Sequence, residues 1–339
     1  MKSFSMISEM IDDATLNWLI EKSNPSVRYF TQTRLLGYGA DHPEVVESKK
    51  DIMTIGLVPK ILDLQQESGY WGEENRFYLD KYRGTVWQLI LLAELGADPN
   101  DARIKKACEF ILAHSFDRSG SGFSVHGSSK EQGGRHSEVI PCLTGNIVFS
   151  LIKLGFIDDE RVQKSIDWIC NYQRCDDGVA GVPKTWPYDR FLGCWGKHTC
   201  LMGVAKALKA LAVVPMEFRS EKVNFKIQEL TEFMLIHHIY KKSHDLEHVS
   251  KPGWLKFGFP LMYQSDALEM LEILTDLGCK DLRMQDAIEK VRMKQNPEHR
   301  WRLENSYNGR MLFNVEVKGE NSKWVTLRAL NVLNKFKSI

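Results

Sequence analysis

The stretch "LAELGADPNDARIKKA", residues 92–107, ends one helix and begins another. Gly96 follows an apolar run, where a left-handed residue closes a helix at little cost because glycine has no Cβ. Asp101 can then cap the amino end of the next helix. The Leu-Gly pair recurs at Gly37, Gly155 and Gly278, and Ala212 takes its place in between. The steps of about sixty residues indicate an internal repeat.

Each repeat holds an apolar helix followed, after a short acidic turn, by a helix with apolar residues every three or four positions. The only strand candidate is 311–319. Closing such an array into a barrel would bury both of its ends. We therefore expect an all-α fold, a single (α/α)6 toroid domain over 1–339 with six inner and six outer helices. The inner helices are expected near 25–36, 84–95, 142–154, 197–212, 261–277 and 323–336, and the outer ones near 6–21, 43–66, 101–115, 160–173, 222–240 and 281–295.

Composition excludes several classes of protein. The net charge of +1 gives no sign of a nucleic-acid-binding surface or a polybasic membrane anchor. No apolar run is long enough to span a bilayer, and the first residues lack the apolar core of a secretory signal. The seven cysteines are odd in number and include no C-x-x-C, so we expect reduced thiols and a cytoplasmic location.

A second signature lies where an outer helix ends. Gln65, Gly69 and Trp71 have the spacing Q-x3-G-x-W, and degenerate copies occur at Gln173 and Gln295. The pattern resembles the QW motif of squalene–hopene cyclases and the glycine-rich repeats of protein prenyltransferase β subunits. Residues 165–211 look especially like a segment of the latter. The resemblance implies an (α/α)6 toroid with a central cavity lined by aromatic residues.

The resemblance does not extend to the chemistry. The D-x-D-D acid motif, the D-D-x-x-D magnesium motif and the zinc-binding Cys and His of the prenyltransferases are all missing. What the resemblance implies is a site for an isoprenoid or another apolar small molecule, with or without catalysis. A non-catalytic binding or scaffold protein is the first alternative. A glycan-active enzyme is the second, and it would need two carboxyls such as Asp266 and Glu304 across a cleft.

Aromatic residues gather in and after the loops that lead into the inner helices. Such rings suit an apolar ligand or a cation held over their faces, although many tryptophans simply wedge loops against helix ends. The wedge role is favoured for Trp71 and Trp301. An arginine beside the last inner helix could bind an anionic head group. The candidate binding residues are Trp87, Trp195, Trp324, Trp254, Tyr188 and Arg302.

The candidate catalytic residues are Asp266, His198, Tyr263 and Glu304. A desolvated Asp266 would have a raised pKa and could act as an acid, or it could simply favour the helix dipole in a first turn. If 194–198 is helical, Cys194 and His198 share a face near Cys142, as in a zinc site. Buried cysteines and a hydrogen-bonded core histidine explain the same residues, so no metal or other cofactor is expected.

Overall fold

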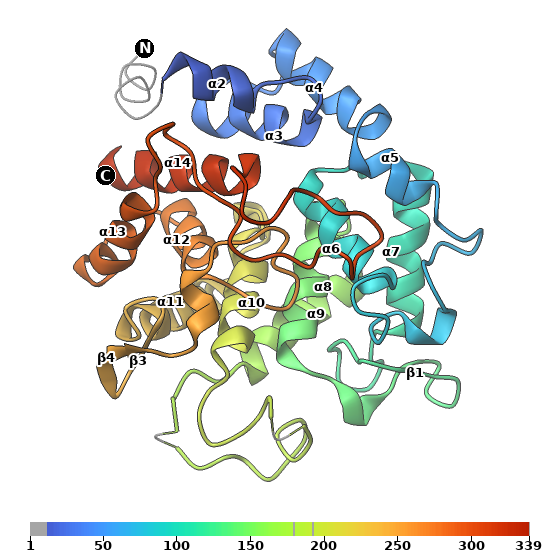
Figure 1. Ribbon diagram of the computed structural model, residues 1–339. Helices are drawn as coiled ribbons and strands as arrows, with labels where there is room; N and C mark the ends of the chain where they lie inside the picture. The colour runs from blue at the N-terminus through green and yellow to red at the C-terminus, as the bar shows by residue number, and fades with distance from the viewer. Residues whose placement is uncertain (1–11, 179, 192, 339) are drawn as a thin grey trace.

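The computed structural model describes residues 12–178, 180–191 and 193–338, and the fold of this part of the chain is mostly helical (Figure 1). The apolar helices are α3 (Pro25–Phe30) with the π-helical turn η1 (Thr31–Leu35), α6 (Thr85–Leu95), α8 (Pro141–Lys153), α10 (Leu201–Ala212), α12 (Ala267–Asp276) and α14 (Lys323–Ser338). The amphipathic helices are α2 (Asp13–Leu19), α4 (Pro43–Thr54), α5 (Leu57–Leu62), α7 (Ala102–His114), α9 (Glu160–Tyr172), α11 (Glu221–Ile236) and α13 (Gln285–Met293). Short 3-10 turns connect them.

The helix ends follow the repeat predicted from the sequence. Gly96 closes α6 in the left-handed region with φ of 74°. Asp101 then caps α7, accepting a hydrogen bond of 2.8 Å from the backbone N–H of Arg103. Asp159 and Asp281 cap the corresponding helical segments in the same way. This part of the prediction is confirmed.

The repeat also ties neighbouring amphipathic helices together. Arg161, beside the cap of α9, donates to Glu109 on α7 at 2.9 Å. Arg283, beside the cap before α13, donates to Glu232 on α11 at 2.7 Å. Both pairs are partly exposed, so each contributes little to the free energy of unfolding.

The apolar helices pack against one another in chain order. α6 contacts α8, α8 contacts α10, α10 contacts α12, α12 contacts α14, and α14 returns to α3, η1 and α2 (Figure 1). Within α6 every residue except Glu94 is buried. The amphipathic helix α7 instead buries one face, including Ile104, Ala107 and Ile111. The two helix classes predicted from hydrophobic periodicity therefore differ in burial as expected.

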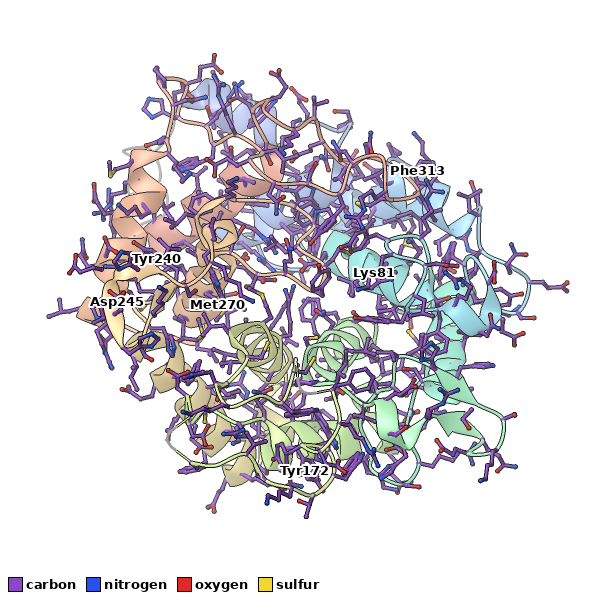
Figure 2. The ribbon with its side chains drawn as sticks, turned by 60° about the horizontal axis from the view of Figure 1, so that its bottom comes forward. Lys81, Tyr172, Tyr240, Asp245, Met270 and Phe313 are labelled. Atoms are coloured by element: carbon purple, nitrogen blue, oxygen red, sulfur yellow. The ribbon has the colours of Figure 1, made fainter. Side chains whose placement is uncertain are left out.

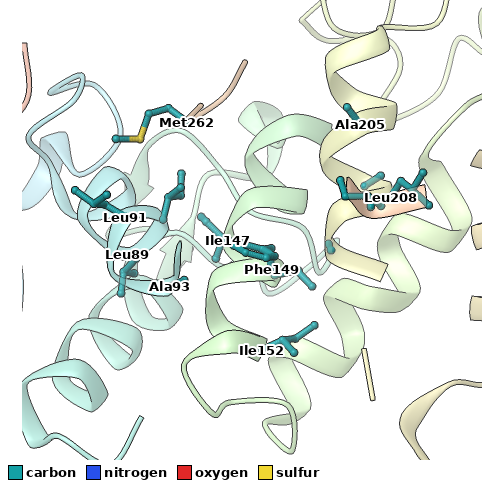
Figure 3. Close-up of a cluster of buried hydrophobic side chains, with 14 of the residues drawn as sticks. Leu89, Leu91, Ala93, Ile147, Phe149, Ile152, Ala205, Leu208 and Met262 are labelled. Carbon is teal, nitrogen blue, oxygen red and sulfur yellow. The ribbon is translucent and has the colours of Figure 1, made fainter. Parts of the chain in front are cut away.

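Figure 3 shows the core where α6, α8 and α10 meet. Leu89 and Leu91 come from α6, Ile147 and Phe149 from α8, and Leu208 from α10. All five are buried, and branched or aromatic side chains of this kind fill space without a polar atom to satisfy.

The Q-x3-G-x-W residues tie one repeat to the next. Gln65 donates to the carbonyl of Gly69 at 3.2 Å and to that of Arg103, on the following amphipathic helix, at 2.9 Å. Trp71 is buried; its indole donates to Ile61 at the end of α5, and its backbone N–H donates to Thr85 in α6. Trp301 repeats this arrangement with Val291 and Thr326. The structural role predicted for these tryptophans is confirmed.

Several predicted boundaries are wrong. The helix expected over 43–66 breaks at Gly56, whose φ of 85° is left-handed. Two apolar helices begin later than expected, at Leu201 and Ala267, because extended and turn segments precede them. No strand forms at 311–319. The strands are instead β1 (Gly127–Ser128), β2 (Gly133–Gly134), β3 (Lys241–Lys242) and β4 (Asp245–Val249), paired antiparallel as β1-β2 and β3-β4. Residues 6–11 of the first predicted helix lie outside the described residues.

Among the helices of the described residues, none is both long and apolar enough to cross a membrane.

Candidate functional site

An aromatic cluster lies at the amino ends of α6 and α12. Tyr82 packs edge-on to Trp87 at 5.0 Å between ring centroids, stacks parallel to Tyr263 at 6.2 Å, and contacts Tyr307 at 4.1 Å. Trp87 also contacts Tyr78 at 5.2 Å and Tyr263 at 6.2 Å. Three separate stretches of the chain, residues 78–87, 263 and 307, therefore supply one group of rings, which we call the aromatic cluster: Tyr78, Tyr82, Trp87, Tyr263 and Tyr307.

Hydrogen bonds to the backbone hold the rings in place. The indole of Trp87 donates to the carbonyl of Tyr78 at 2.9 Å, and the amide of Gln88 donates to the carbonyl of Tyr82 at 3.1 Å. The hydroxyl of Tyr307 donates to the carbonyl of Leu261 at 3.2 Å. The segment that carries Tyr307 crosses in front of the apolar helices in Figure 1. Trp87 is fully buried while Tyr263 is half-buried, so the cluster has a closed side and an open side.

A lysine ammonium lies on the open side. The Nζ atom of Lys81 is 5.0 Å from the ring centroid of Tyr78, 4.9 Å from that of Tyr263 and 5.9 Å from that of Trp87. These distances are within the range of cation–π attraction. Figure 2 labels Lys81 beside α6, toward the middle of the molecule. Its side chain is exposed, and no ion pair joins it to an acid of the described residues.

An open pocket adjoins the cluster. It is lined by the cations Lys81, Arg83 and Arg310, with Asp80, Gly72 and Leu312 completing the wall. Asp80 is already paired with Arg76 at 2.7 Å, so the three cations are not neutralised by it. The Arg310 guanidinium also lies 4.9 Å from the Tyr82 ring. The site thus combines apolar ring faces with a positively charged rim.

The phenols of Tyr78, Tyr82 and Tyr307 are neutral at physiological pH. Burial raises the pKa of Tyr82 to about 12 and moves those of Tyr78 and Tyr307 further above their ordinary value. Uncharged rings keep their attraction for apolar groups and for cations, without offering an anion.

Asp266 lies at the start of α12, three residues after Tyr263. It is buried and caps the helix: one carboxylate oxygen accepts from the N–H of Glu269 at 2.8 Å, and the other accepts from the N–H of Gly258 at 2.9 Å. Burial raises the pKa of Asp266 to about 7. The raised pKa fits the predicted role as an acid, whereas the hydrogen bond to Glu269 fits the predicted role in the first turn of the helix. Both carboxylate oxygens are already engaged by backbone N–H groups.

Charged residues within the core form a network that sequence reasoning missed. Lys206 is fully buried and donates to Glu269 at 2.8 Å, and Lys209 donates to Glu269 at 2.8 Å and pairs with Glu94. Burial alone would raise the pKa of Glu269, but these ammonium groups outweigh it and hold the pKa well below its usual range. The feature of the sequence that could have revealed the network is the presence of two lysines, Lys206 and Lys209, within the apolar helix α10.

This network continues toward the other end of the helices. Arg328 joins Glu94 at 3.2 Å and Glu272 at 3.1 Å, and Arg34 joins Glu272 at 2.7 Å. A cavity of about 90 Å³ lies beside these charges, with Phe30, Phe149 and Trp324 among its lining. The interior of the helix array is therefore aromatic at the amino ends of the helices and ionic further along.

The remaining predicted aromatic residues lie in other clusters. Trp195 packs against Trp168 at 6.0 Å and Tyr188 at 5.1 Å. Trp324 stacks on Phe259 at 4.1 Å, and Trp254 is fully buried. Ring contacts therefore join two pairs of the predicted site residues, Trp87 with Tyr263 and Trp195 with Tyr188, and the two pairs belong to different clusters.

The polar candidates are also separated. Glu304 accepts from Lys294 at 2.5 Å and from the N–H of Phe257 at 2.9 Å, and it lines a small open pocket with Arg302. His198 is exposed and lies 3.8 Å from Asp177. The two carboxyls nominated for glycan chemistry, Asp266 and Glu304, are thus each held by backbone N–H groups.

The helical premise of the zinc prediction is wrong, because residues 194–198 form turns and bends. Cys142 and Cys194, which the zinc prediction grouped with His198, are both free and half-buried. Among the residues that the structure describes, no three His, Cys, Asp or Glu side chains are placed to hold a metal ion.

No family model and no curated protein matches the chain. Among solved structures, the type II terpene cyclase MstE from Scytonema is similar in its apo form, with 14% identity, a TM-score of 0.45, and coverage of 96% of this chain and 99% of that one. Its complex with geranylgeranyl dihydroxybenzoate, described as its substrate, aligns with 14% identity, a TM-score of 0.43 and the same coverage.

Proposed function

We propose that the protein is an (α/α)6 toroid that binds an isoprenoid or another apolar small molecule at the aromatic cluster. The succession of contacts from α6 through α14 and back to α3 supports the toroid, as does the packing of α14 against α2, near the other end of the chain. The apolar helices, with η1 extending α3, form its inner layer in this proposal.

The observation that carries the binding function is the pairing of a half-open aromatic cluster with a cationic rim. Rings that pack on one another from three separate stretches of the chain are preorganised, so a ligand does not have to order them. The half-buried ring of Tyr263 and the faces beneath Lys81 are the surfaces left for an apolar chain. Lys81, Arg83 and Arg310 suit an anionic head group on that chain, such as a phosphate or carboxylate.

Binding without proton transfer is the form of this function that the geometry favours. An acid that protonates a substrate must present its proton to the ligand, whereas both oxygens of Asp266 face backbone N–H donors. Catalysis by a cyclase or transferase, and a cytoplasmic location, remain predictions from the sequence. The glycan-active hypothesis rests only on the pair of carboxyls, Asp266 and Glu304.

The test is a titration with farnesol and farnesyl diphosphate, followed by tryptophan fluorescence and melting temperature. A ligand that binds only the native state raises the melting temperature in step with the logarithm of its concentration above saturation. Tyr263→Ala should weaken binding severalfold. Tyr38→Ala, which removes a ring stacked on His42 in another part of the structure, is the matched control and should not. If neither compound shifts the melting temperature, or if both variants behave alike, the proposal is wrong.

A further inference from the structure

A small cavity lies toward the carboxyl ends of the apolar helices, and none of the five residues of the aromatic cluster lines it. Each of the six apolar helices, with η1 counted as part of α3, contributes to its wall. Lys153, Ala212 and Asp276 line it and are the last residues of α8, α10 and α12. Figure 3 labels two further lining residues, Ala93 and Phe149. The cavity is therefore distinct from the proposed isoprenoid site.

The size and polarity of this cavity indicate what kind of occupant fits it. Its volume of about 90 Å³ is smaller than the roughly 150 Å³ of a cavity that takes up benzene, so it has no room for an isoprenoid chain. Eight of its sixteen lining residues are charged, whereas cavities that stay empty in proteins are apolar. The cavity is thus suited to water or to one small ion.

The charges around the cavity do not cancel. Every acid that lines it is already paired with a cation: Glu94 with Lys209 and Arg328, Glu269 with Lys206 and Lys209, Glu272 with Arg34 and Arg328, and Asp276 with Lys335. Lys153 also lines the cavity, and no ion pair joins it to an acid of the described residues. Among the lining residues and their ion-pair partners, six cations therefore face four acids, which is an excess of two positive charges.

The indole N–H of Trp324 is an unused donor in the same wall. Trp324 is only 4% exposed, its ring stacks on Phe259 at 4.1 Å, and it lines the cavity. Of the four buried indoles without an acceptor in the described part of the chain, it is the one that lines this cavity. A buried donor without an acceptor costs free energy, and an oxygen atom in the cavity would remove that cost.

The cavity opens to solvent on its cationic side. Arg34 and Lys153 line it and are exposed, whereas Lys209 and Arg328 line it and are buried. The exposed acid of the same wall, Asp276, is paired with a lysine of α14. An anion from solvent therefore meets two cations at the opening, and one of them, Lys153, has no acid to release.

We propose that this cavity binds a small oxyanion, either inorganic phosphate or the carboxylate of a short organic acid. Lys153 supplies the unpaired charge and Trp324 the unused donor, while the buried cations hold the acids of the wall in their ion pairs. Oxygen atoms that accept hydrogen bonds from charged groups form the stronger class of hydrogen bond, which suits a phosphate or carboxylate. The inference does not depend on any ligand at the aromatic cluster.

The test is isothermal titration calorimetry of the full-length protein with sodium phosphate and with sodium acetate, at an ionic strength kept constant with sodium chloride. Lys153→Met should weaken the binding of the anion about tenfold or more, as expected when a hydrogen bond to a charged group is lost. Trp324→Phe keeps the ring but removes the N–H, and it should weaken binding about two- to tenfold. Lys105→Met, which removes an exposed lysine of α7, is the matched control and should bind like the wild type. The comparison of phosphate with acetate shows which oxyanion the cavity prefers.

Lys81→Ala shows which of the two cationic places takes the anion. It removes a cation of the open pocket beside the aromatic cluster, so phosphate and acetate should bind this variant as they bind the wild type. Loss of binding in Lys81→Ala but not in Lys153→Met would overturn the proposal, because the anion would then lie in that other pocket. So would the absence of saturable heat with both anions, since the cavity would then hold only water. Failure of farnesol to bind leaves these results unchanged, so the two proposals fail separately.

Discussion

The ammonium nitrogen of Lys81 lies 4.9 Å from the ring centroid of Tyr263, on the open side of the aromatic cluster. A cation of the protein itself thus occupies the ring faces that the proposed ligand would use. Lys81 also lines the cationic pocket. In our proposal its ammonium group contacts the rings when no ligand is present and the anionic head group when a ligand is bound.

We predict that Lys81→Ala affects two ligands in opposite directions. A neutral isoprenoid such as farnesol should bind about two- to fivefold more tightly, because it no longer displaces an exposed cation worth roughly 0.5–1 kcal/mol on the rings. Farnesyl diphosphate should bind more weakly, because it loses one of three cations. Isothermal titration calorimetry measures both. Lys130→Ala, an exposed lysine outside the site, is the control, and equal effects on the two ligands would contradict the exchange of Lys81 between rings and head group.

The buried carboxyl of Asp266 should make stability depend on pH. Burial raises its pKa in the folded protein to about 7, above the ordinary value of 3.8, so the folded state retains the proton over a range where the unfolded state has released it. This contribution is fully present below about pH 4 and is lost as the pH rises through 7. Asp266→Asn cannot titrate, so the free energy of unfolding of the wild type should fall relative to that of the variant, by up to a few kcal/mol, between pH 4 and 7. Urea denaturation across this range checks the slope, and parallel profiles for the two proteins would exclude it.

The cap itself is tested by Asp266→Ala. This change leaves the N–H groups of Gly258 and Glu269 without their acceptor in a buried place, so we expect a loss of roughly 2–4 kcal/mol in the free energy of unfolding. Asp101→Ala, which removes a more exposed cap at the start of α7, should cost less, about 0.5–2 kcal/mol. A smaller loss at Asp266 than at Asp101 would show that its carboxylate does not stabilise the fold.

Breaking the buried ion network should be costly. Glu269→Gln removes the charge that both Lys206 and Lys209 contact, and we expect a loss of roughly 3–5 kcal/mol because buried cations are left uncompensated. Adding Lys206→Met to Glu269→Gln should recover part of that loss, since the fully buried ammonium is then gone. Guanidinium unfolding of the two variants decides this, and a double variant less stable than the single one would be the contrary result.

The ties between repeats are tested by Trp71→Phe. The change keeps most of the buried ring but deletes the indole N–H, leaving the carbonyl of Ile61 without this donor. We expect a loss of roughly 1–3 kcal/mol in the free energy of unfolding. Trp301→Phe should behave alike, because its indole donates to Val291 in the same arrangement at 2.7 Å. Thermal and urea denaturation measure both, and a neutral outcome for the two variants would mean that the hydrogen bonds of the repeat do not stabilise it.

The sequence by itself determined the helices, their two classes and the way they end. Gly96 and Asp101 act within a few residues of themselves, through a left-handed turn and a helix cap, so their roles can be read from local chemistry. Hydrophobic periodicity is local in the same sense, which is why the buried face of α7 was predicted correctly. The wedge role of Trp71 and Trp301 could be predicted because the motif that carries these tryptophans recurs along the chain.

Only the tertiary structure decided which side chains meet. Lys81 reaches Tyr263, and Tyr82 reaches Tyr307, across long stretches of chain whose folding no local pattern encodes. His198 was grouped with cysteines by spacing along an assumed helix, but that segment forms turns and bends instead, and the side chain lies beside Asp177. Burial inside the helix array was likewise needed to show that Asp266 has a raised pKa while its carboxylate caps α12. Contacts of this kind depend on how the helices pack in three dimensions, because the energy that selects them is shared among residues that are distant in the sequence.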